Sequence, residues 1–514
     1  MRIFIIFGII GFFLNSCSIS NKHLIKDLSF NYNKRVIAHR GAWKSHQYPE
    51  NSIASLREAI SQNYAGSEFD IRMTMDDSLI INHDPSYHQL EIEKRKYNDL
   101  IQYKLSNGEQ LPTLRSFLLF GKKNTTSTKL ILEIKPSEIS KERGIQIARK
   151  VVALVHLLKC KNIVEYISFD YDILKEILKL DKKAITYYLN GNKSPLELKK
   201  DGIKGADYHF EAYNYHPNWI KEAKENKILL NVWTVNQPKE MEWLIANDFN
   251  FITTNEPELL VEVEKKSILH QGWKLTFSDE FNYKGLPDST YWNYDVGGHG
   301  WGNNEAQYYT YADTNNIIVS NGTLKIIALN KQIEQNNYTS TKLTTYQRYS
   351  MKYGKVDCRA KLPAGKGTWP AIWMLPNSIK NNSEDWPLCG EIDIMEHVGK
   401  DPNTIHNSLH SFLYNHIKNT QITYFQKVDA VSDQFHNYGI EWTPDYIQFL
   451  IDEKVVFRSN KGENGRVIKN EGWPFDKPYF LILNLAIGGN WGGTIDSSIF
   501  PSIFEIDYVR IYQK

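Results

Sequence analysis

Cysteine is scarce in this chain, charge is balanced, and no apolar run is long enough to cross a bilayer. Four cysteines occur in 514 residues. The three beyond position 17 form an odd set, which argues against a disulfide framework. A disulfide bond between Cys358 and Cys389 is left open by the sequence. Lys and Arg total 61 against 59 Asp and Glu, so no basic field predicts nucleic acid as a partner.

The apolar run that does occur is short and lies at the N-terminus. It extends from Ile3 to Leu14, about the length of a signal-peptide core. The next residues, Asn15 to Cys17, resemble the end of a bacterial lipobox, although Asn15 departs from the usual small or apolar residue. We expect lipidation at Cys17, with ordinary signal cleavage nearby as the alternative.

Either outcome predicts an exported protein. A signal peptide over residues 1–17 and a polar tether over 18–33 would place the mature chain in the bacterial cell envelope. It would be lipid-anchored in the outer membrane, on the periplasmic or surface face, or lie in the periplasm. The lipid anchor would be its only contact with a membrane.

Two rhythms divide the rest of the chain, whose length predicts two or three domains. Residues 34–262 alternate short apolar strands with amphipathic helices, which indicates a parallel α/β sheet and, with eight strands, a TIM barrel. Residues 270–514 show short strands between Gly, Asn and Pro turns, the pattern of an all-β sandwich. The predicted fold class is therefore multidomain, a TIM barrel followed by a sandwich.

Individual elements can be assigned in the first half. Helical periodicity marks Ser52–Asn63, Glu142–Leu158 and Pro238–Asn247, and Ala206–Phe210 is a ninth strand candidate. The eight candidate barrel strands are Arg35–His39, Ser67–Met73, Leu79–His83, Leu130–Lys135, Glu165–Asp170, Ala184–Leu189, Ile228–Val235 and Phe249–Thr253.

Charged and polar side chains gather at the ends of the first candidate strands, where barrel enzymes carry their active sites. Oxygen ligands in this number suit Ca²⁺ or Mg²⁺. Arg40 and Lys135 suit a phosphate, although Lys135 could instead pair with a barrel carboxylate. Two histidines can act as acid and base at phosphorus. The set comprises His39, Arg40, Glu68, Asp70, His83, Glu133 and Lys135.

The order of these motifs resembles the glycerophosphodiester phosphodiesterase family over nearly all of 34–258. The motifs are His39-Arg40-Gly41, Pro49-Glu50-Asn51-Ser52, Glu68-x-Asp70, His83-Asp84, Glu133-Ile134-Lys135, Trp233-Thr234-Val235-Asn236 and Ile252-Thr253-Thr254-Asn255. The resemblance implies a metal held by Glu68, Asp70 and Glu133. It also implies His39 and His83 as the acid–base pair, Arg40 on the phosphate and Glu50 in support. A degenerate barrel without activity is the alternative.

Three carboxylates lie within six residues of an apolar, strand-like segment, Glu391 to Glu396. An unpaired charge in a buried strand costs several kcal/mol, so acids there need a reason. Glu391 and Asp393 share a face, whereas Glu396 would point away in a regular strand. One β-bulge would turn the Glu396 side chain back to the face that carries Glu391 and Asp393. Two leaning glutamates can then reach the roughly 5–5.5 Å separation of a retaining glycosidase. A half-exposed acidic strand is the alternative.

The surrounding sequence, over about 272–513, resembles the family 16 glycoside hydrolases and within them the laminarinases. The motifs are Trp369-Pro370-Ala371-Ile372-Trp373-Met374-Leu375-Pro376, Trp386-Pro387, His397-Val398-Gly399, Asp401–His410, Trp301-Gly302-Asn303-Asn304-Glu305-Ala306-Gln307-Tyr308-Tyr309-Thr310 and Gly488-Gly489-Asn490-Trp491-Gly492-Gly493. The resemblance implies a jelly-roll sandwich whose concave face binds a β-glucan. Glu391 would be the nucleophile, Glu396 the general acid/base, and Asp393 would tune protonation between them. Clustered like charges raise at least one pKa, as this division of labour needs.

Further residues are candidates for the sugar cleft and for a structural ion. The sugar-binding candidates are Trp386, Trp369, Asn304, Glu305, His410 and Trp491. Trp373 shares a strand face with Trp369, and core packing is the alternative for both. His410 could equally be an ordinary strand histidine. The family often holds a structural Ca²⁺ on the convex face, and Glu280, Gly322 and Asp507 match those positions.

The sequence thus predicts an exported bifunctional hydrolase. One domain would cleave β-1,3-glucan or mixed β-1,3/1,4-glucan, and the other a glycerophosphodiester, with Ca²⁺ or Mg²⁺ in the barrel. A shared substrate, a glucan decorated with phosphoglycerol, is one way the two activities could be coupled. A glucan-binding or sensing lipoprotein without activity and a transglycosylase are the alternatives.

Overall fold

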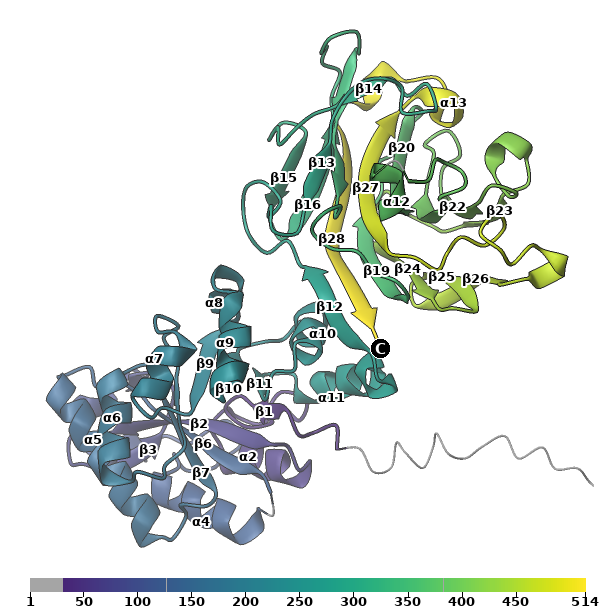
Figure 1. Cartoon of the computed structure of the whole chain (residues 1–514). Helices are drawn as coiled ribbons and strands as arrows, with labels where there is room; N and C mark the ends of the chain where they lie inside the picture. Colours follow the sequence, from purple (N-terminus) through teal and green to yellow (C-terminus); the bar gives the residue numbers. More distant parts are fainter. Residues whose placement is uncertain (1–30, 126, 382) are drawn as a thin grey trace, which may run out of the picture. The chain divides into compact units, whose positions relative to one another are not determined.

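The computed structural model describes residues 31–125, 127–381 and 383–514, which divide into two compact units between Ser267 and Ile268 (Figure 1). The predicted signal peptide 1–17, the lipidation site Cys17 and most of the 18–33 tether lie outside these residues. Among the described helices, none has the length and apolar content that a bilayer span requires.

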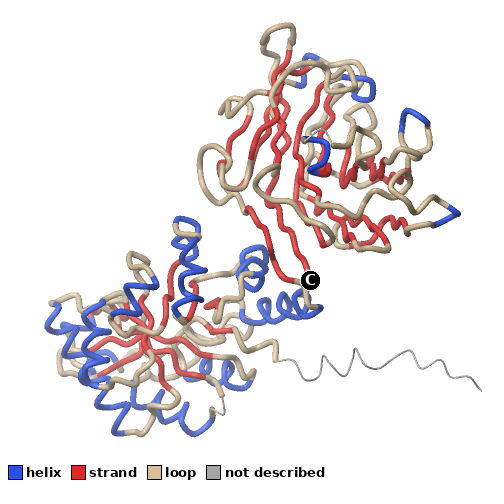
Figure 2. The backbone as a smooth tube through the Cα atoms, viewed as in Figure 1, coloured by secondary structure: helices blue, strands red, loops and turns tan. Residues whose placement is uncertain are grey.

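The first unit is a nearly closed barrel of parallel strands surrounded by helices (Figure 2). Its sheet runs in the order β10-β9-β8-β7-β6-β2-β1-β11. One hydrogen bond connects the two ends of this sheet. The amide of Val235, just after β10, donates to the carbonyl of Thr253, within β11, over 3.0 Å. The strands are β1 (Val36–Ala38), β2 (Gly66–Met73), β6 (Lys129–Ile134), β7 (Val164–Ser168), β8 (Thr186–Tyr188), β9 (Gly205–His209), β10 (Leu229–Trp233) and β11 (Ile252–Thr254).

The predicted TIM barrel is confirmed, but one predicted strand was wrong. Leu79–His83 is not a barrel strand, because β3 (Leu79–Ile81) pairs antiparallel with the end of β2 and lies off the barrel path. The ninth candidate supplies β9 in its place. Both segments are short and apolar, and periodicity alone does not distinguish a hairpin strand from a barrel strand.

Several helices of this unit begin at a residue whose side chain caps the first turn. The Ser52 side chain accepts from the Ser55 amide and starts α2 directly after the second polar motif. The longer helices are α2 (Ile53–Ser61), α4 (Leu114–Asn124), α5 (Lys141–Leu157), α6 (Tyr171–Leu180), α9 (Asn218–Asn226), α10 (Pro238–Ala246) and α11 (Pro257–Lys266). The shorter elements are β4 (Ser86–Tyr87), β5 (Leu90–Glu91), α3 (Tyr97–Leu100), α7 (Pro195–Lys200) and α8 (Phe210–Tyr215).

The second unit is a sandwich of two antiparallel sheets, as predicted. One sheet runs β15-β16-β28-β19-β24-β25-β26, with β12 beside β28. Its strands are β12 (Lys274–Asp279), β15 (Ile317–Ser320), β16 (Thr323–Ala328), β19 (Gly354–Lys361), β24 (His436–Trp442), β25 (Tyr446–Ile451), β26 (Lys454–Asn460) and β28 (Ser502–Gln513).

The other sheet carries the acidic run and is ordered β13-β18-β27-β20-β21-β22-β23. Its strands are β13 (Asn293–Asp295), β18 (Lys342–Thr344), β20 (Thr368–Pro376), β21 (Glu391–Glu396), β22 (Thr404–His410), β23 (Ile422–Lys427) and β27 (Tyr479–Ile487). Short elements outside both sheets are β14 (Gln307–Tyr309), β17 (Tyr338–Ser340), α12 (Asn377–Lys380) and α13 (Gly489–Gly492).

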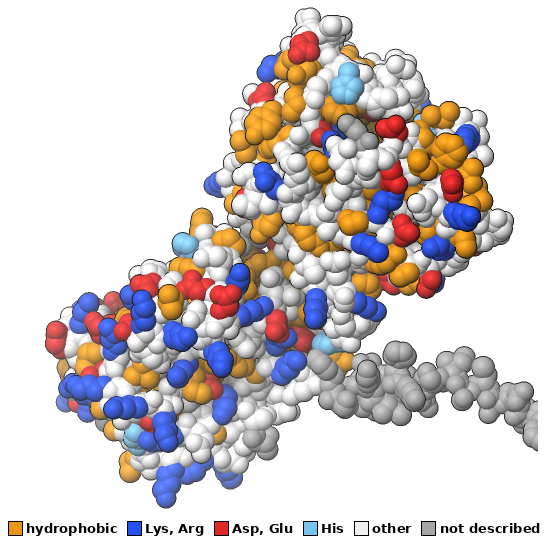
Figure 3. Space-filling model, in the orientation of Figure 1, with side chains coloured by type: hydrophobic (Ala, Val, Ile, Leu, Met, Phe, Trp, Pro, Cys, Tyr) orange, Lys and Arg blue, Asp and Glu red, His pale blue; other side chains and the backbone are white. Residues whose placement is uncertain are grey.

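Apolar side chains between the two sheets form the core of this unit. In β20, Ile372 and Met374 enter the core, while Trp369 and Trp373 belong to smaller clusters outside it. The two tryptophans therefore share the other face of the sheet, as their spacing predicted. Cys358 and Cys389 are both buried and free, so they form no disulfide. Acidic and basic side chains both occur on the visible face of each unit (Figure 3).

Candidate functional sites

Strands β2 and β6 bring three carboxylates together inside the barrel. Asp70 and Glu133 stand opposite each other in the parallel register, and Glu68 lies two residues before Asp70 on the same face. Oxygen atoms of the three side chains all lie within 4.8 Å of one another. The structure therefore groups the residues predicted to hold a metal.

Lys135 lies against this cluster. Its Nζ is 2.9 Å from Asp70 Oδ1 and 2.8 Å from Glu133 Oε1. The sequence left open whether Lys135 meets phosphate or a carboxylate, and the structure shows the carboxylate pairing. Lys135 thus supplies one positive charge to a site that contains three acids.

The protonation of the cluster reflects burial and mutual repulsion. Burial, followed by repulsion from Asp70, raises the pKa of Glu68 well above its ordinary value. Burial and then Asp70 also raise the pKa of Glu133, to about 7. Burial opposes ionisation of Asp70 as well, but Lys135 and the Asn51 amide outweigh it and hold that pKa at about 2. Lys135 alone therefore does not offset the three carboxyl groups, and a divalent cation would supply the missing positive charge.

His39 and Arg40 follow β1 at the rim of this cluster. His39 Nε2 lies 4.0 Å from Glu68 Oε2, and its Nδ1 lies 2.8 Å from Asn255 Oδ1. Burial and the neighbouring Arg40 lower the pKa of His39. Arg40 Nη1 donates to Glu50 Oε2 over 2.5 Å, so Glu50 contacts the residue predicted to bind phosphate.

The turn after β1 requires glycine. Gly41 has φ +85°, and a Cβ there would lie 2.3 Å from Ser55 Oγ. Arg40 itself has φ +56°, a conformation that non-glycine residues seldom adopt. The sharp turn sends the Arg40 amide toward Glu68 Oε2, 2.8 Å away.

His83 lies in the loop after β3, not at the end of a barrel strand. Its Nδ1 is 2.7 Å from Asp84 Oδ1, and its side chain is 39% exposed. It nevertheless shares one hollow with Arg40, Glu50 and Asn51. His39 does not line this hollow, but each of the two histidines interacts electrostatically with Asp70. The predicted acid–base histidines therefore both lie near the carboxylate cluster, although they come from different kinds of element.

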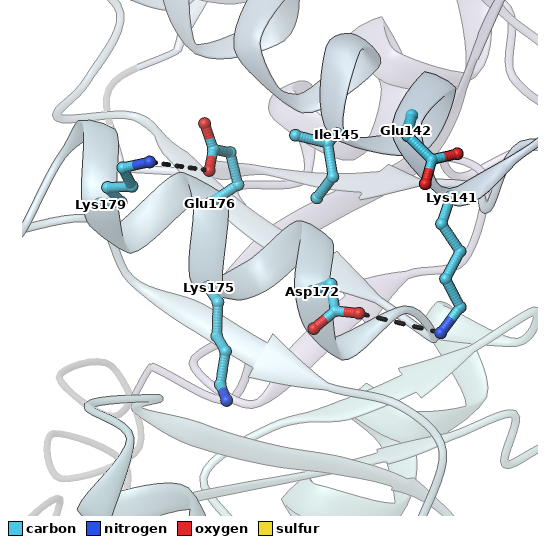
Figure 4. A pocket seen from close by; sticks show the side chains of 7 residues that line it. All are labelled: Lys141, Glu142, Ile145, Asp172, Lys175, Glu176 and Lys179. Atoms are coloured by element: carbon cyan, nitrogen blue, oxygen red, sulfur yellow. Dashed lines mark ion pairs between the residues drawn. The ribbon is translucent and has the colours of Figure 1, made fainter.

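A second hollow, between α5 and α6, contains none of the predicted site residues (Figure 4). Its charged side chains pair with each other, Lys141 with Asp172 at 3.9 Å and Lys179 with Glu176 at 3.8 Å. It is a feature of the outer helical layer.

In the sandwich, the predicted bulge lies between Glu391 and Glu396. The β20 register pairs Ile372 with Met395 but Trp373 with Asp393, so Ile394 is the extra residue. Ile394 and Met395 are consecutive and both enter the core. This break in alternation returns Glu396 to the face that carries Asp393.

The three acids meet polar partners from neighbouring strands. His410 Nε2 lies 3.1 Å from Asp393 Oδ2 and 3.9 Å from Glu391 Oε1. Trp369 Nε1 donates to Glu396 Oε1 over 3.0 Å. Both contacts hold the carboxyl groups on the sheet face outside the core.

Burial raises the pKa of each of the three acids to about 8. For Glu391 and Glu396 the next cause is repulsion from Asp393. Asp393 is raised by burial and lowered by a hydrogen bond with Glu391. Because the groups interact strongly, they titrate as a set. The site therefore retains protons near neutral pH, as a general acid requires.

The remaining sugar-binding candidates lie around these acids. The Trp386 ring centroid is 6.1 Å from that of His410. Trp369 is 9% exposed and packs edge-on against Trp491 at 5.4 Å, so it positions Glu396 more than it offers a free face.

Asn304 and Glu305 belong to a loop that meets the end of β27. Asn304 Nδ2 donates to Asn490 Oδ1 over 2.9 Å. Glu305 accepts from Gln307 over 2.8 Å, and burial raises its pKa. Repulsion from Glu305 is one cause of the raised pKa of Glu396, which places Glu305 near the acids.

Sequence reasoning missed Lys342 in β18. This lysine is 7% exposed, and its Nζ lies 4.5 Å from the Trp301 ring centroid and 4.8 Å from that of Trp373. Asp295 Oδ2 is 3.6 Å away. Burial lowers the pKa of Lys342, while its charge favours ionised Glu391. A lone lysine in a short strand gives no sequence signal, because it is typical of an exposed face.

The carboxylates predicted for a structural Ca²⁺ are paired with arginines. Arg510 donates to both Glu280 oxygens, over 2.9 and 3.0 Å. Asp507 Oδ2 accepts from Arg359 over 2.5 Å. Among the described residues, the groups of acids and histidines close enough for a metal lie elsewhere. Calcium at Glu280, Gly322 and Asp507 remains a prediction that these side-chain contacts do not support.

Comparison with known proteins assigns both units. The model of the glycosyl hydrolases family 16 matches residues 304–510. The Beta-glucanase of Rhodothermus marinus is 47% identical over 247 residues, which are 47% of this chain and 85% of that protein. The chain belongs to glycosyl hydrolase family 16. The model of the glycerophosphoryl diester phosphodiesterase family matches residues 39–259, so the family 16 domain follows a domain of that second family.

Other relatives cover the same half. Glucan endo-1,3-beta-glucosidase A1 of Niallia circulans is 36% identical over 265 residues, which are 47% of this chain and 38% of that protein. The solved laminarinase of R. marinus has 46% identity and a TM-score of 0.45, over 47% of this chain and 97% of that chain. A third family model, beta-glucan synthesis-associated protein SKN1/KRE6/Sbg1, matches residues 212–382. With its two domains the chain is a hydrolase of glycosidic and phosphodiester bonds.

Proposed function

We propose that the chain is an exported bifunctional hydrolase whose family 16 domain is a retaining endo-β-1,3-glucanase or a mixed-linkage β-1,3/1,4-glucanase. The observation that carries this proposal is the bulged strand that holds Glu391, Asp393 and Glu396 on one face. The names of the relatives, a beta-glucanase and a glucan endo-1,3-beta-glucosidase, support the substrate class.

From these contacts we infer a double displacement. Ionised Glu391 attacks the anomeric carbon while protonated Glu396 gives its proton to the leaving oxygen. The Glu396 carboxylate then takes a proton from a water molecule, whose oxygen bonds to the anomeric carbon as the bond from that carbon to Glu391 breaks. Asp393 and His410 lie beside the nucleophile, and the Trp369 indole fixes the orientation of Glu396. Because the acids share protons through their interaction, one can be charged while another remains neutral.

We infer for the barrel a metal-dependent glycerophosphodiester hydrolysis. Glu68, Asp70 and Glu133 would hold Ca²⁺ or Mg²⁺, both of which prefer carboxylate oxygens. The residues fit such an ion, because Glu68 Oε1 is buried without a hydrogen-bond partner among the described residues and the cluster lacks positive charge. When bound, the cation neutralises charge that develops on the phosphate.

Side chains around the carboxylate cluster would transfer protons and bind the phosphate. His39, with its lowered pKa, is suited to accept a proton, and His83, which also interacts with Asp70, would donate one. Arg40 is held by Glu50 in the hollow that His83 also lines, where the Arg40 guanidinium can contact phosphate oxygens.

The proposal includes export through the N-terminal segment to the cell envelope and an anchor at Cys17. It also includes a shared substrate, a β-glucan carrying phosphoglycerol groups that the barrel would remove before the sandwich cleaves the backbone. The presence of both families in one chain motivates this coupling.

Product analysis on laminarin, lichenan, agarose and xyloglucan tests the glucanase, with Glu391→Gln as the control. We expect oligosaccharides from laminarin or lichenan and none from the control. No cleavage of either glucan would overturn the proposal and would favour a sensing protein. Products longer than the substrate would favour a transglycosylase.

Release of glycerol or glycerol phosphate from a phosphoglycerol-bearing glucan tests the coupling, with Glu68→Gln as the control. Hydrolysis of a simple glycerophosphodiester without release from the decorated glucan would reject the shared substrate and retain the barrel activity.

A further inference from the structure

The sheet register draws one line of side chains across the face that carries the acids. Directly opposed residues in antiparallel strands point to the same face. From one edge of the sheet to the other, the line runs through Asp295, Lys342, Asn484, Ala371, Glu396, His406 and Phe425. Glu396 lies on this line, which is perpendicular to the strands.

The two arms of the line differ in chemistry. Toward β18 the arm is polar and closed, because Asn484 accepts from the Trp373 indole over 2.7 Å and Lys342 is enclosed by two tryptophan rings. Toward β23 the arm is aromatic and open, and Phe425 at the sheet edge is 64% exposed.

Ring contacts connect this open arm to Glu396. The His406 centroid lies 5.6 Å from Phe425 and 4.8 Å from Trp491. Trp491 contacts Trp369, whose indole donates to Glu396. His406 Nε2 is buried and has no hydrogen-bond partner among the described residues, so one polar atom beside the rings has its hydrogen-bonding capacity unmet.

We propose that His406 and Phe425 form a binding site for the leaving portion of the β-glucan. This inference rests on the proposed glucanase activity. Glu396 protonates the leaving oxygen, so the leaving sugars lie nearer Glu396 than Glu391. In the polar arm Asn484 and Lys342 are buried, whereas the open aromatic arm suits apolar contact with sugar faces. Phe425 is two strands from Glu396, about 9–10 Å, beyond the first leaving ring.

That distance gives the test. Phe425→Ala is compared with wild type on laminarioligosaccharides and on an aryl β-laminarioligosaccharide whose leaving group is a single nitrophenol ring. We expect kcat/KM to fall about three- to tenfold on the oligosaccharides, the range for one aromatic contact. On the aryl substrate it should remain unchanged, because the nitrophenol does not reach Phe425. Phe425→Trp should restore activity on the oligosaccharides.

Val455→Ala is the matched control, since Val455 is 53% exposed in β26, an edge strand of the other sheet. It should leave both activities unchanged. Equal loss on both substrates for Phe425→Ala, loss on the aryl substrate alone, or no loss on either would overturn the site. A wild-type protein that cleaves neither substrate would instead overturn the proposed glucanase.

Discussion

Replacing Glu391 with Gln is expected to stabilise the sandwich, and increasingly so as the pH rises. Its side chain is 16% exposed, and burial and Asp393 raise its pKa from 4.5 to about 8. Between these two pH values the folded state therefore keeps Glu391 protonated to a larger fraction than the unfolded chain does. A carboxyl group with a raised folded-state pKa lowers stability as pH rises from the unfolded value to the folded one.

The magnitude follows from the pKa difference. For one group, the penalty is about 1 kcal/mol near pH 5 and about 4 kcal/mol near pH 8. Glutamine carries no charge at either pH, so the variant should avoid this penalty. The proposed nucleophile is thus maintained at the expense of stability, which is common at active sites.

Thermal unfolding of the full chain, followed by tryptophan fluorescence, measures the effect. Most of the 13 tryptophans lie in the second unit, so the signal reports mainly on the sandwich. Glu505→Gln is the control, because Lys361 and Thr323 lower the pKa of Glu505 against the effect of burial. The reasoning is refuted if Glu391→Gln gives no greater gain near pH 8 than near pH 5, or if the control shows the same rise.

Three further predictions address the two sites. Trp369→Phe removes the hydrogen bond that lowers the pKa of Glu396. The alkaline limb of the glucanase kcat/KM profile should therefore move up by as much as about one pH unit, and a downward shift would contradict this. Deleting Ile394 should restore a regular strand that keeps Glu391 and Glu396 in phase. Glucan hydrolysis should remain detectable despite about 2–4 kcal/mol of lost core packing. Inserting Ala before Ile394 should abolish it, because six regular steps would place the two glutamates about 20 Å apart along the strand. Chelation with EDTA should abolish phosphodiester hydrolysis, reversibly with Ca²⁺ or Mg²⁺, and spare glucan hydrolysis. Equal loss of both activities would contradict separate sites.

The sequence predicted those features that leave a local signal. The five-residue spacing of Glu391 and Glu396 required a bulge, because strand side chains alternate with period two, and Ile394 forms it. The barrel acids were grouped correctly because parallel strand ends converge on one rim. The fold class followed from the change between the two halves, from alternating strands and helices to short strands separated by turns.

Features that depend on distant packing were not predictable. The charge of Lys342 is enclosed by rings from two other segments, and no spacing within β18 indicates this. From the sequence, Lys135 could bind either a phosphate or a carboxylate. Only the structure shows that it pairs with Asp70. The hairpin strand β3 and the barrel strands share the same apolar pattern, so only their pairing distinguishes them.

Covalent labelling tests the central claim most directly. A 2-deoxy-2-fluoro laminarioligosaccharide with a good leaving group slows breakdown of the glycosyl-enzyme, so mass spectrometry of digested protein identifies the nucleophile. The mechanism predicts one sugar adduct on the peptide that contains Glu391, and on the carboxyl of Glu391 itself. An adduct on Glu396, or a protein that cleaves laminarin and inverts the anomeric centre without forming an adduct, would contradict it.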